Sequence, residues 1–233
     1  MAEYIVTYLD VDSIQDYIFS SNDLAQHIGA SECVNQTVGD WIFETLEALK
    51  ISSNAERLPK QPGCKVALWK ITDASITSGN LGGEIIYAGG GKAALLFSND
   101  DNCRRFTRQL SLRVLQEAPG LQLNVRSQSI NWDKNDALKD ALNHLRGMPS
   151  MRQHSAPLLG LGVTAACDFT ALPAYKEYTE PDGTTQLISK VVSCKLDAAE
   201  KTGKERLHCL LPQVREKGFE FIYDFDQFGT LNE

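Results

Sequence analysis

Residues 85–97 read IIYAGGGKAALLF, and this stretch decides the fold that we predict for the chain. Two short strand-like runs, at 84–87 and 93–97, flank three consecutive glycines at 89–91. Glycine adopts the positive φ that a tight turn between antiparallel strands requires, so the pattern predicts a short β-hairpin. The next residue is Lys92, so the tip of the hairpin carries a cation and no carboxylate.

The segments around the hairpin follow the order of a known supersecondary unit. YIVTYL at 4–9 is a compact β-branched and aromatic run, typical of a buried strand. Apolar residues recur at every third and fourth position from 30 to 50, which predicts an amphipathic helix. We also predict a helix that begins at a Ser13–Asp16 capping box, a strand at 65–72, a helix at 100–118 and a strand at 121–130.

If the additional strand at 65–72 is set aside, the order is strand, helices, hairpin, helix, strand. This is the ferredoxin-like βαββαβ unit, and the predicted fold class is α+β. We assign this unit to residues 1–131 and a C-terminal α/β extension that packs on it to residues 132–233. In the extension we expect a helix at 136–145, a strand at 160–167 and a helix at 188–201.

Composition excludes several classes of function. The chain has 233 residues and a formal net charge of -7, which argues against a broad basic surface for nucleic acid. The six cysteines are far apart and show no zinc-site spacing. The first residues contain no basic region of the kind that opens a signal peptide, and the longest apolar stretch, 157–166, is too short for a bilayer. We therefore expect a cytoplasmic protein without membrane contact.

Asp10 and Asp12 follow the first predicted strand in a pattern that suits metal binding. Alternate residues of a strand point the same way, so both carboxylates can face one site. Two-metal nucleotidyl transfer needs such acids together with acids at the tip of the neighbouring hairpin. The alternative interpretation is that Asp10 ends a strand and Asp12 caps a helix.

The glycine turn and Lys92 suit a phosphate. Glycines let the backbone approach a phosphate with its N–H donors, and a lysine adds a point charge. The alternative is a tight hairpin without a ligand; a P-loop is excluded because its spacing and its following helix are missing. We assign no catalytic residue. The candidate nucleotide-binding residues are Ser13, Gly89, Gly90, Gly91 and Lys92, and the candidate metal ligands are Asp10 and Asp12.

Four segments resemble a known family. YLDVDSIQDYIF at 8–19 closely resembles the opening of palm domains in the large polymerase-like subunit of type III CRISPR effector complexes. The hairpin at 85–97 resembles that of the first, non-catalytic palm of this subunit. GVTAACDFTALPA at 162–174 and ISKVVSCKLDAA at 188–199 are similar to segments that follow that palm.

The resemblance implies a nucleotidyl-cyclase-like palm whose catalytic turn is degenerate. Catalytic palms of the family carry paired acids after two glycines and convert ATP into cyclic oligonucleotides in antiviral defence. Gly91 and Lys92 occupy those positions here, while Asp10 matches the metal ligand at the strand end. The implied role is therefore nucleotide binding or scaffolding, with ATP and magnesium or manganese as the implied ligands.

The implied partners are a partner palm domain or other subunits of a defence complex. We expect the chain to be a fragment or a single-palm relative of a larger protein whose second palm makes the cyclic product. Two other functions stay open. One is an active nucleotidyl cyclase or nucleotidyltransferase that uses Asp10, Asp12 and a further acid such as Glu84 or Asp224, and the other is a purely structural subunit.

Overall fold

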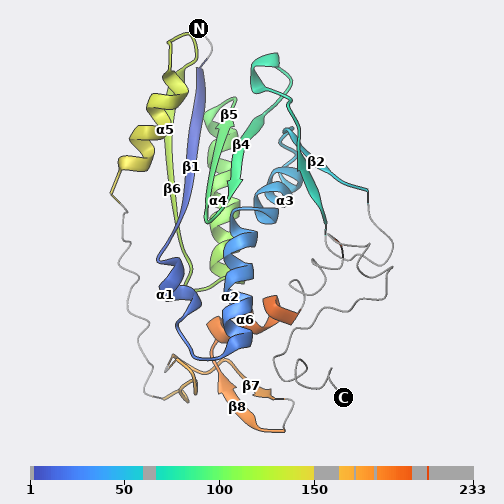
Figure 1. Ribbon diagram of the computed structural model, residues 1–233, viewed down its shortest axis with the longest axis vertical. Helices are drawn as coiled ribbons and strands as arrows, with labels where there is room; N and C mark the ends of the chain where they lie inside the picture. Colours follow the sequence, from blue (N-terminus) through green and yellow to red (C-terminus); the bar gives the residue numbers. More distant parts are fainter. Residues whose placement is uncertain are drawn as a thin grey trace, which may run out of the picture.

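The structure is a mixed α+β fold built around an antiparallel sheet (Figure 1). It is a computed structural model, and it describes residues 3–59, 67–149, 163–170, 172–180, 183–200 and Cys209. The strands are β1 (Glu3–Asp12), β2 (Ala55–Arg57), β3 (Trp69–Ile71), β4 (Gly83–Gly89), β5 (Lys92–Phe97), β6 (Gln122–Asn131), β7 (Lys176–Thr179) and β8 (Thr185–Ile188). The helices are α1 (Ile14–Ile18), α2 (Leu24–Thr37), α3 (Asp40–Ala48), the 3-10 turn η1 (Ile76–Ser78), α4 (Asp100–Glu117), α5 (Ala137–Gly147) and α6 (Lys190–Ala198).

The four strands of the central sheet lie in the order β4-β5-β1-β6, and every neighbouring pair is antiparallel. The predicted hairpin is confirmed as β4 and β5, and the strands predicted at 4–9 and 121–130 are confirmed as β1 and β6. Residues 6–9 of β1 are buried because the strand lies between two others and is covered on both faces. The apolar run that opens the sequence therefore forms an inner strand.

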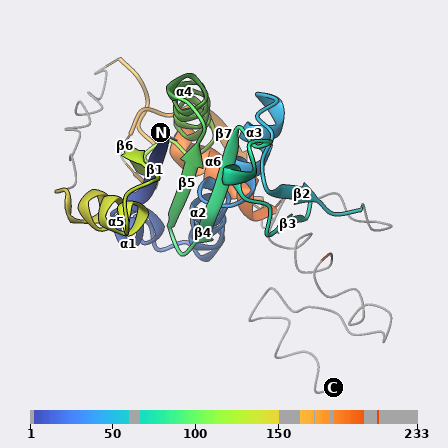
Figure 2. The same cartoon turned by 90° about the horizontal axis from the view of Figure 1, so that it is seen from above.

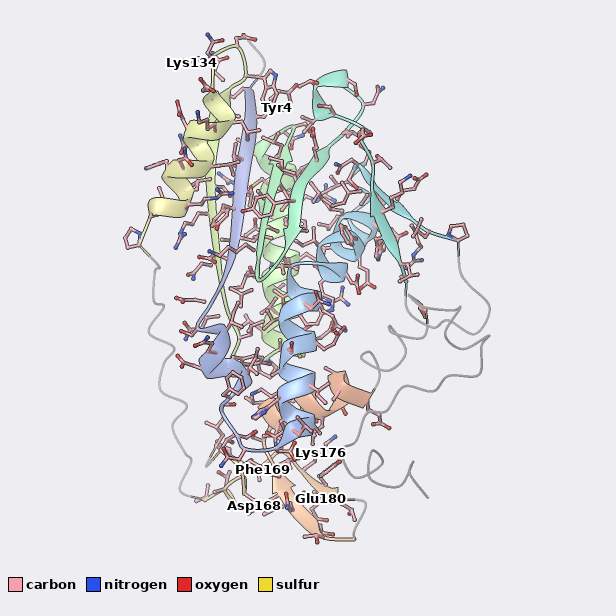
Figure 3. All side chains as sticks on the ribbon, viewed as in Figure 1. Tyr4, Lys134, Asp168, Phe169, Lys176 and Glu180 are labelled. Atoms are coloured by element: carbon pink, nitrogen blue, oxygen red, sulfur yellow. The ribbon has the colours of Figure 1, made fainter. Side chains whose placement is uncertain are left out.

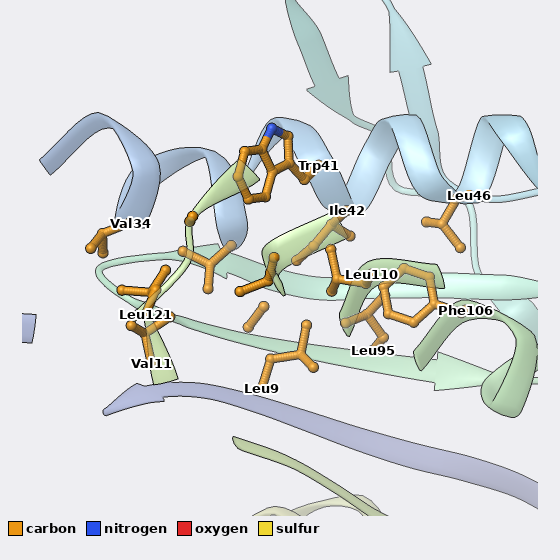
Figure 4. Packing of buried hydrophobic residues seen from close by; sticks show 14 of the residues in the cluster. Leu9, Val11, Val34, Trp41, Ile42, Leu46, Leu95, Phe106, Leu110 and Leu121 are labelled. Atoms are coloured by element: carbon orange, nitrogen blue, oxygen red, sulfur yellow. The ribbon is translucent and has the colours of Figure 1, made fainter. Parts of the chain in front are cut away.

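Helices pack on both faces of the sheet, and Figure 2 shows α5 on one side and α3 and α4 on the other. Leu9, Ile42 and Phe106 belong to the larger core, which α2, α3 and α4 form with the sheet (Figure 4). Tyr8 belongs to a smaller core beneath α5. Because side chains alternate along a strand, Asp10 lies on the same face as Tyr8 and α5.

The segment predicted as one helix from 30 to 50 is two helices. α2 begins earlier than expected, because the Asp23 carboxylate caps its first turn. The chain breaks at Gly39, whose φ and ψ of -127° and -106° lie outside the helical region. Val34 before the break and Trp41 after it are both buried, so the apolar periodicity continues through the break and conceals it.

Two predicted strands differ from the structure. Of the strand predicted at 65–72, residues 65 and 66 lie outside the described residues, and Trp69–Ile71 is extended as β3. β3 pairs with β2, which the sequence did not predict. Residues 160–162 of the strand predicted at 160–167 lie outside the described residues. The remainder, 163–167, forms no strand and makes a single isolated bridge, from Ala166 to Pro173. The hairpin of this region is β7 and β8, which lie beyond it in the chain.

The helix predicted at 136–145 is confirmed as α5. The helix predicted at 188–201 corresponds to α6, but it begins at Lys190 because Ile188 ends β8, and residue 201 lies outside the described residues. α5 packs on the sheet through Ala141 and Leu145, and α6 packs along α2. The division of the chain at 131 and 132 stays a prediction. Among the described residues, no helix combines the length and the apolar composition needed to cross a bilayer.

The β7–β8 hairpin and the turn before it lie at the end of the molecule opposite Tyr4, as Figure 3 shows through Asp168, Lys176 and Glu180. The Asp168 carboxylate accepts a hydrogen bond from the Leu187 N–H at 2.7 Å, which ties this turn to β8. This end of the molecule is therefore built by the turn at Asp168 and by β7 and β8, beside the start of α2.

Candidate functional site

The two candidate metal ligands lie at the end of β1 on the face that carries α5. Asp10 and Asp12 occupy alternate positions of the strand, so both belong to one face. The Lys92 ammonium lies opposite Asp10 in the strand pairing, 3.7 Å from Oδ1 of that residue. Their side chains are 53% and 25% exposed. An ion pair this exposed contributes about 1 kcal/mol or less, so Lys92 stays available to a stronger anion.

Ser13 links the end of β1 to α1. It has a φ of 50°, in the left-handed region, and its N–H donates a hydrogen bond of 2.8 Å to Asp12 Oδ1. The predicted Ser13–Asp16 capping box is wrong, because the Ser13 side chain makes no capping hydrogen bond. Residues that cap through their side chains have extended backbone, which Ser13 lacks. The structure therefore places Ser13 next to the β1 carboxylates but gives it no role as a cap.

The glycine turn is anchored on one side and open at its tip. Gly89, Gly90 and Gly91 have φ values of 153°, 62° and 78°, which L side chains rarely adopt. A Cβ at Gly89 or Gly90 would meet no atom within 4 Å, whereas one at Gly91 would lie 2.4 Å from Ile14 Cδ1. The Gly91 carbonyl accepts a hydrogen bond of 2.8 Å from the Val11 N–H. The turn therefore holds a fixed shape with two glycines facing open space, as a backbone anion site requires.

A third acid for a metal site does not come from the hairpin. Within the described part of the chain, no group of three His, Cys, Asp or Glu side chains is placed to hold a metal ion. Glu84 lies opposite Leu96, four residues along β5 from Lys92 and so about 13 Å away. Its carboxylate instead accepts a hydrogen bond of 2.6 Å from the Ile76 N–H. Asp224 lies outside the described residues.

Two arginines lie on this same face, and the sequence prediction missed both. The Arg146 guanidinium carbon, at the end of α5, lies 5.8 Å from the Tyr8 ring centroid and 5.6 Å from the Tyr87 centroid. Arg146 Nη2 donates a long hydrogen bond of 3.3 Å to the Tyr87 hydroxyl. Arg126 lies opposite Tyr8 on β6 and donates a hydrogen bond of 3.0 Å to the Leu145 carbonyl. We call Tyr8, Tyr87, Arg126 and Arg146 the arginine–tyrosine cluster.

The arginine–tyrosine cluster lies next to the candidate nucleotide site on β1. Tyr8 precedes Asp10 by two residues on β1, so the cluster and the Lys92–Asp10 pair share one face of the sheet. Burial raises the pKa of Tyr8 to about 12, with further upward contributions from Tyr87 and Asp10 and a downward one from Arg146. The Tyr8 phenol is therefore neutral at physiological pH.

The cluster makes this face locally cationic on an acidic protein. Neither Arg126 nor Arg146 forms an ion pair with a carboxylate in the ranges that the structure describes. Together with Lys92 they supply three positive charges near the two carboxylates of β1. Since the chain has a net charge of -7, this local excess of positive charge favours an anionic ligand.

The sequence contained only part of the signal for this cluster. Alternation along 121–130 separates Arg126 from the apolar side chains at 121, 123 and 125, but the pairing of Tyr8 with Arg126 depends on strand register. Arg146 belongs to α5, which follows β6 in the chain, and no local pattern connects it with β1 or β4.

Comparisons with known proteins found matches among solved structures at low identity. No protein-family profile matches the chain, and no curated protein matches its sequence. The crystal structure of the apo Csm1–Csm4 cassette matches with a TM-score of 0.40 and 12% identity over 62% of this chain. The crystal structure of Csm1 in T. onnurineus matches with a TM-score of 0.39 and 12% identity over 63% of this chain.

This chain spans less than a fifth of the length of each solved chain, 18% and 19% respectively. We therefore base the function proposed below on the residues of this chain.

Proposed function

We propose that the chain is a degenerate palm of the type III CRISPR large-subunit kind, which binds the phosphates of a nucleotide at its glycine turn. The order of the sheet supports a ferredoxin-like palm. β1, β4, β5 and β6 are the first to fourth strands of the unit, and they lie in the order second, third, first, fourth. Helices connect the first strand to the second and the third to the fourth, as in βαββαβ.

One observation carries the proposal, namely the Lys92–Asp10 pair at the tip of the hairpin. In two-metal nucleotidyl transfer, acids of the strand and of the hairpin hold cations that bridge the phosphates. Here the hairpin contributes an ammonium beside the strand-end acid instead. The ammonium and the open backbone of the turn suit direct contact with a phosphate.

The biological role that we infer is a non-catalytic module of an antiviral defence complex. A palm that binds nucleotide without hydrolysing it can hold the substrate of a partner palm, or serve as a scaffold for it. The motifs at 8–19 and 85–97 support a place in the large subunit, next to a second palm that makes cyclic oligonucleotides. ATP is the ligand that we propose; magnesium or manganese can accompany its phosphates, but binding to this chain does not require the metal.

Calorimetric titration with ATP, in buffers with and without magnesium, tests the proposal. We expect binding that persists in EDTA and falls roughly tenfold or more in Lys92→Ala, because a charge-assisted contact is lost. Arg104→Gln is the control, since Arg104 is exposed on α4, which packs on the other face of the sheet. ATP binding that is unaffected by Lys92→Ala would contradict the proposal.

Asp10→Asn separates this proposal from the enzyme alternative. Asp10 and Asp12 lie on one face, so a metal-dependent nucleotidyl cyclase or nucleotidyltransferase would need the Asp10 charge to bind its cation. A phosphate-binding turn responds in the opposite direction, because removal of the carboxylate next to Lys92 removes repulsion from the ligand. We expect Asp10→Asn to strengthen ATP binding in EDTA. The enzyme would be established if the wild-type chain bound ATP in a magnesium- or manganese-dependent way and formed product, and if Asp10→Asn weakened that binding.

A further inference from the structure

We propose that Arg146 is a second phosphate contact, so that the ligand is a nucleoside di- or triphosphate whose phosphate chain runs along β1 from Lys92 to Arg146. This inference rests on the proposed function, because it extends the site that begins at the glycine turn. It assigns a ligand class and a recognition residue that lies outside the βαββαβ unit.

The spacing of the two cations supports an extended phosphate chain. Lys92 lies opposite Asp10, and Arg146 lies over the ring of Tyr8, two residues away on the same strand and face. Two residues of a strand span about 7 Å. A single phosphate cannot make close contacts with both cations at this separation, whereas a di- or triphosphate presents charged oxygens along its length.

Arg146 is available for such a contact. The residue is exposed, and its guanidinium donates a long hydrogen bond of 3.3 Å to the Tyr87 hydroxyl. The rings of Tyr8 and Tyr87 lie near the guanidinium and limit the directions that its donors take. A guanidinium held in place, without a carboxylate partner in the described ranges, suits bidentate contact with phosphate oxygens.

Arg126 has a different role in this arrangement. Its guanidinium donates to the Leu145 carbonyl in the last turn of α5, next to Arg146. Carbonyls at a helix end lack partners within the helix, so this bond fixes the end from which Arg146 projects. Arg126 is thus a positioning residue, while its charge adds to the attraction for the ligand.

The experiment compares AMP, ADP and ATP by calorimetry in EDTA, with the wild-type chain, Arg146→Gln and the control Arg104→Gln. We expect wild-type affinity to rise from AMP to ATP. In Arg146→Gln we expect affinity for ADP and ATP to fall roughly tenfold to a hundredfold, as loss of a charged hydrogen bond implies, while AMP changes by about twofold or less. Since Arg146 is exposed, the variant should keep the wild-type unfolding midpoint.

The outcomes separate this inference from the proposed function. If ATP binding depends on Lys92 while Arg146→Gln matches the wild type for all three nucleotides, the second contact is refuted and the proposed function stands. If Arg146→Gln weakens AMP and ATP equally, the extended phosphate chain is refuted. If the wild-type chain binds none of the nucleotides, both the inference and the proposed function fail.

Discussion

Gly29 of α2 lies directly against the main chain of Lys195 of α6: a Cβ added at Gly29 would be 1.7 Å from the Lys195 carbonyl oxygen. Neither helix can keep its position if this glycine gains a side chain, because backbone atoms cannot rotate away as a flexible side chain can. Gly29 thus sets the distance at which the C-terminal extension packs on α2.

We predict that Gly29→Ala destabilises the protein by about 3 kcal/mol, near the upper range for overpacking. Urea unfolding measures the change. Gly147→Ala is the matched control, since a Cβ there would meet no atom within 4 Å, and we expect it to change stability by about 0.5 kcal/mol or less. Equal stability of the two variants would show that α2 and α6 do not pack as described.

Lys195 is a buried cation that ties α6 to the end of α1. Its Nζ donates hydrogen bonds to the Tyr17 carbonyl at 2.6 Å and to Ser20 Oγ at 2.7 Å, and it lies 4.3 Å from the Tyr17 ring centroid. We predict that Lys195→Ala costs about 2–4 kcal/mol, because these acceptors lose their donor in a buried site. Lys195→Met keeps most of the side-chain volume and isolates the loss of the hydrogen bonds from the loss of packing.

The pH dependence of stability gives Lys195 a second test. Burial lowers the pKa of the Lys195 ammonium, although Cys33 partly opposes the shift. The unfolded chain therefore binds more protons than the native protein between the lowered pKa and the ordinary lysine value, so stability contributed by this group rises with pH in that window. We expect the rise to be absent from Lys195→Met. If the difference in unfolding free energy between the wild type and Lys195→Met stays constant with pH, Lys195 does not titrate in this way.

The sheet was predictable from the sequence because its strands carry local signals. The alternation at 121–130, the buried run at 4–9 and the glycine turn at 89–91 each follow from backbone and burial rules that act over a few residues. The break at Gly39 was missed because buried positions keep their period across it. β7 and β8 were missed because each is only four residues long, and neither KEYT nor TQLI alternates apolar with polar residues.

The candidate site was predictable only where its residues are close in sequence. Asp10 and Asp12 lie at the end of one strand, Ser13 comes directly after it, and Lys92 follows its own turn, so each could be assigned to its element. Asp10 and Lys92 lie opposite each other only because of the register of β1 and β5, and the position of Arg146 depends on how α5 packs on the sheet. Such contacts between distant segments arise from tertiary packing, which local patterns do not encode.

The glycine turn offers a prediction with an internal control. Gly91 has a φ of 78°, and a Cβ there would lie 2.4 Å from Ile14 Cδ1, whereas Gly90 has a φ of 62° and open space around it. We predict that Gly90→Ala costs about 1 kcal/mol through backbone strain alone, and that Gly91→Ala costs about 1–2 kcal/mol more. Ile14→Ala introduced with Gly91→Ala should recover part of that excess. Thermal unfolding measures all three, and equal losses at the two glycines would contradict the contact with α1.

Tyr8 should make the protein sensitive to alkali. Its pKa is raised by burial to about 12, so it keeps its proton in the native state after the unfolded chain has lost one near pH 10. The unfolded state then binds fewer protons, and stability falls as pH rises from 10 to 12. We expect a loss of about 1 kcal/mol from this group, since Arg146 and nearby solvent reduce the cost of the charged form.

Urea unfolding of the wild type and of Tyr8→Phe at pH 9 and 11 measures this loss. Tyr8→Phe should lose less stability over this interval, while Tyr175→Phe, at an exposed tyrosine, should follow the wild type. Parallel curves for the wild type and Tyr8→Phe would mean that the Tyr8 hydroxyl is not buried beside Tyr87 and Asp10, and the arginine–tyrosine cluster would then lack the geometry on which the Arg146 contact depends.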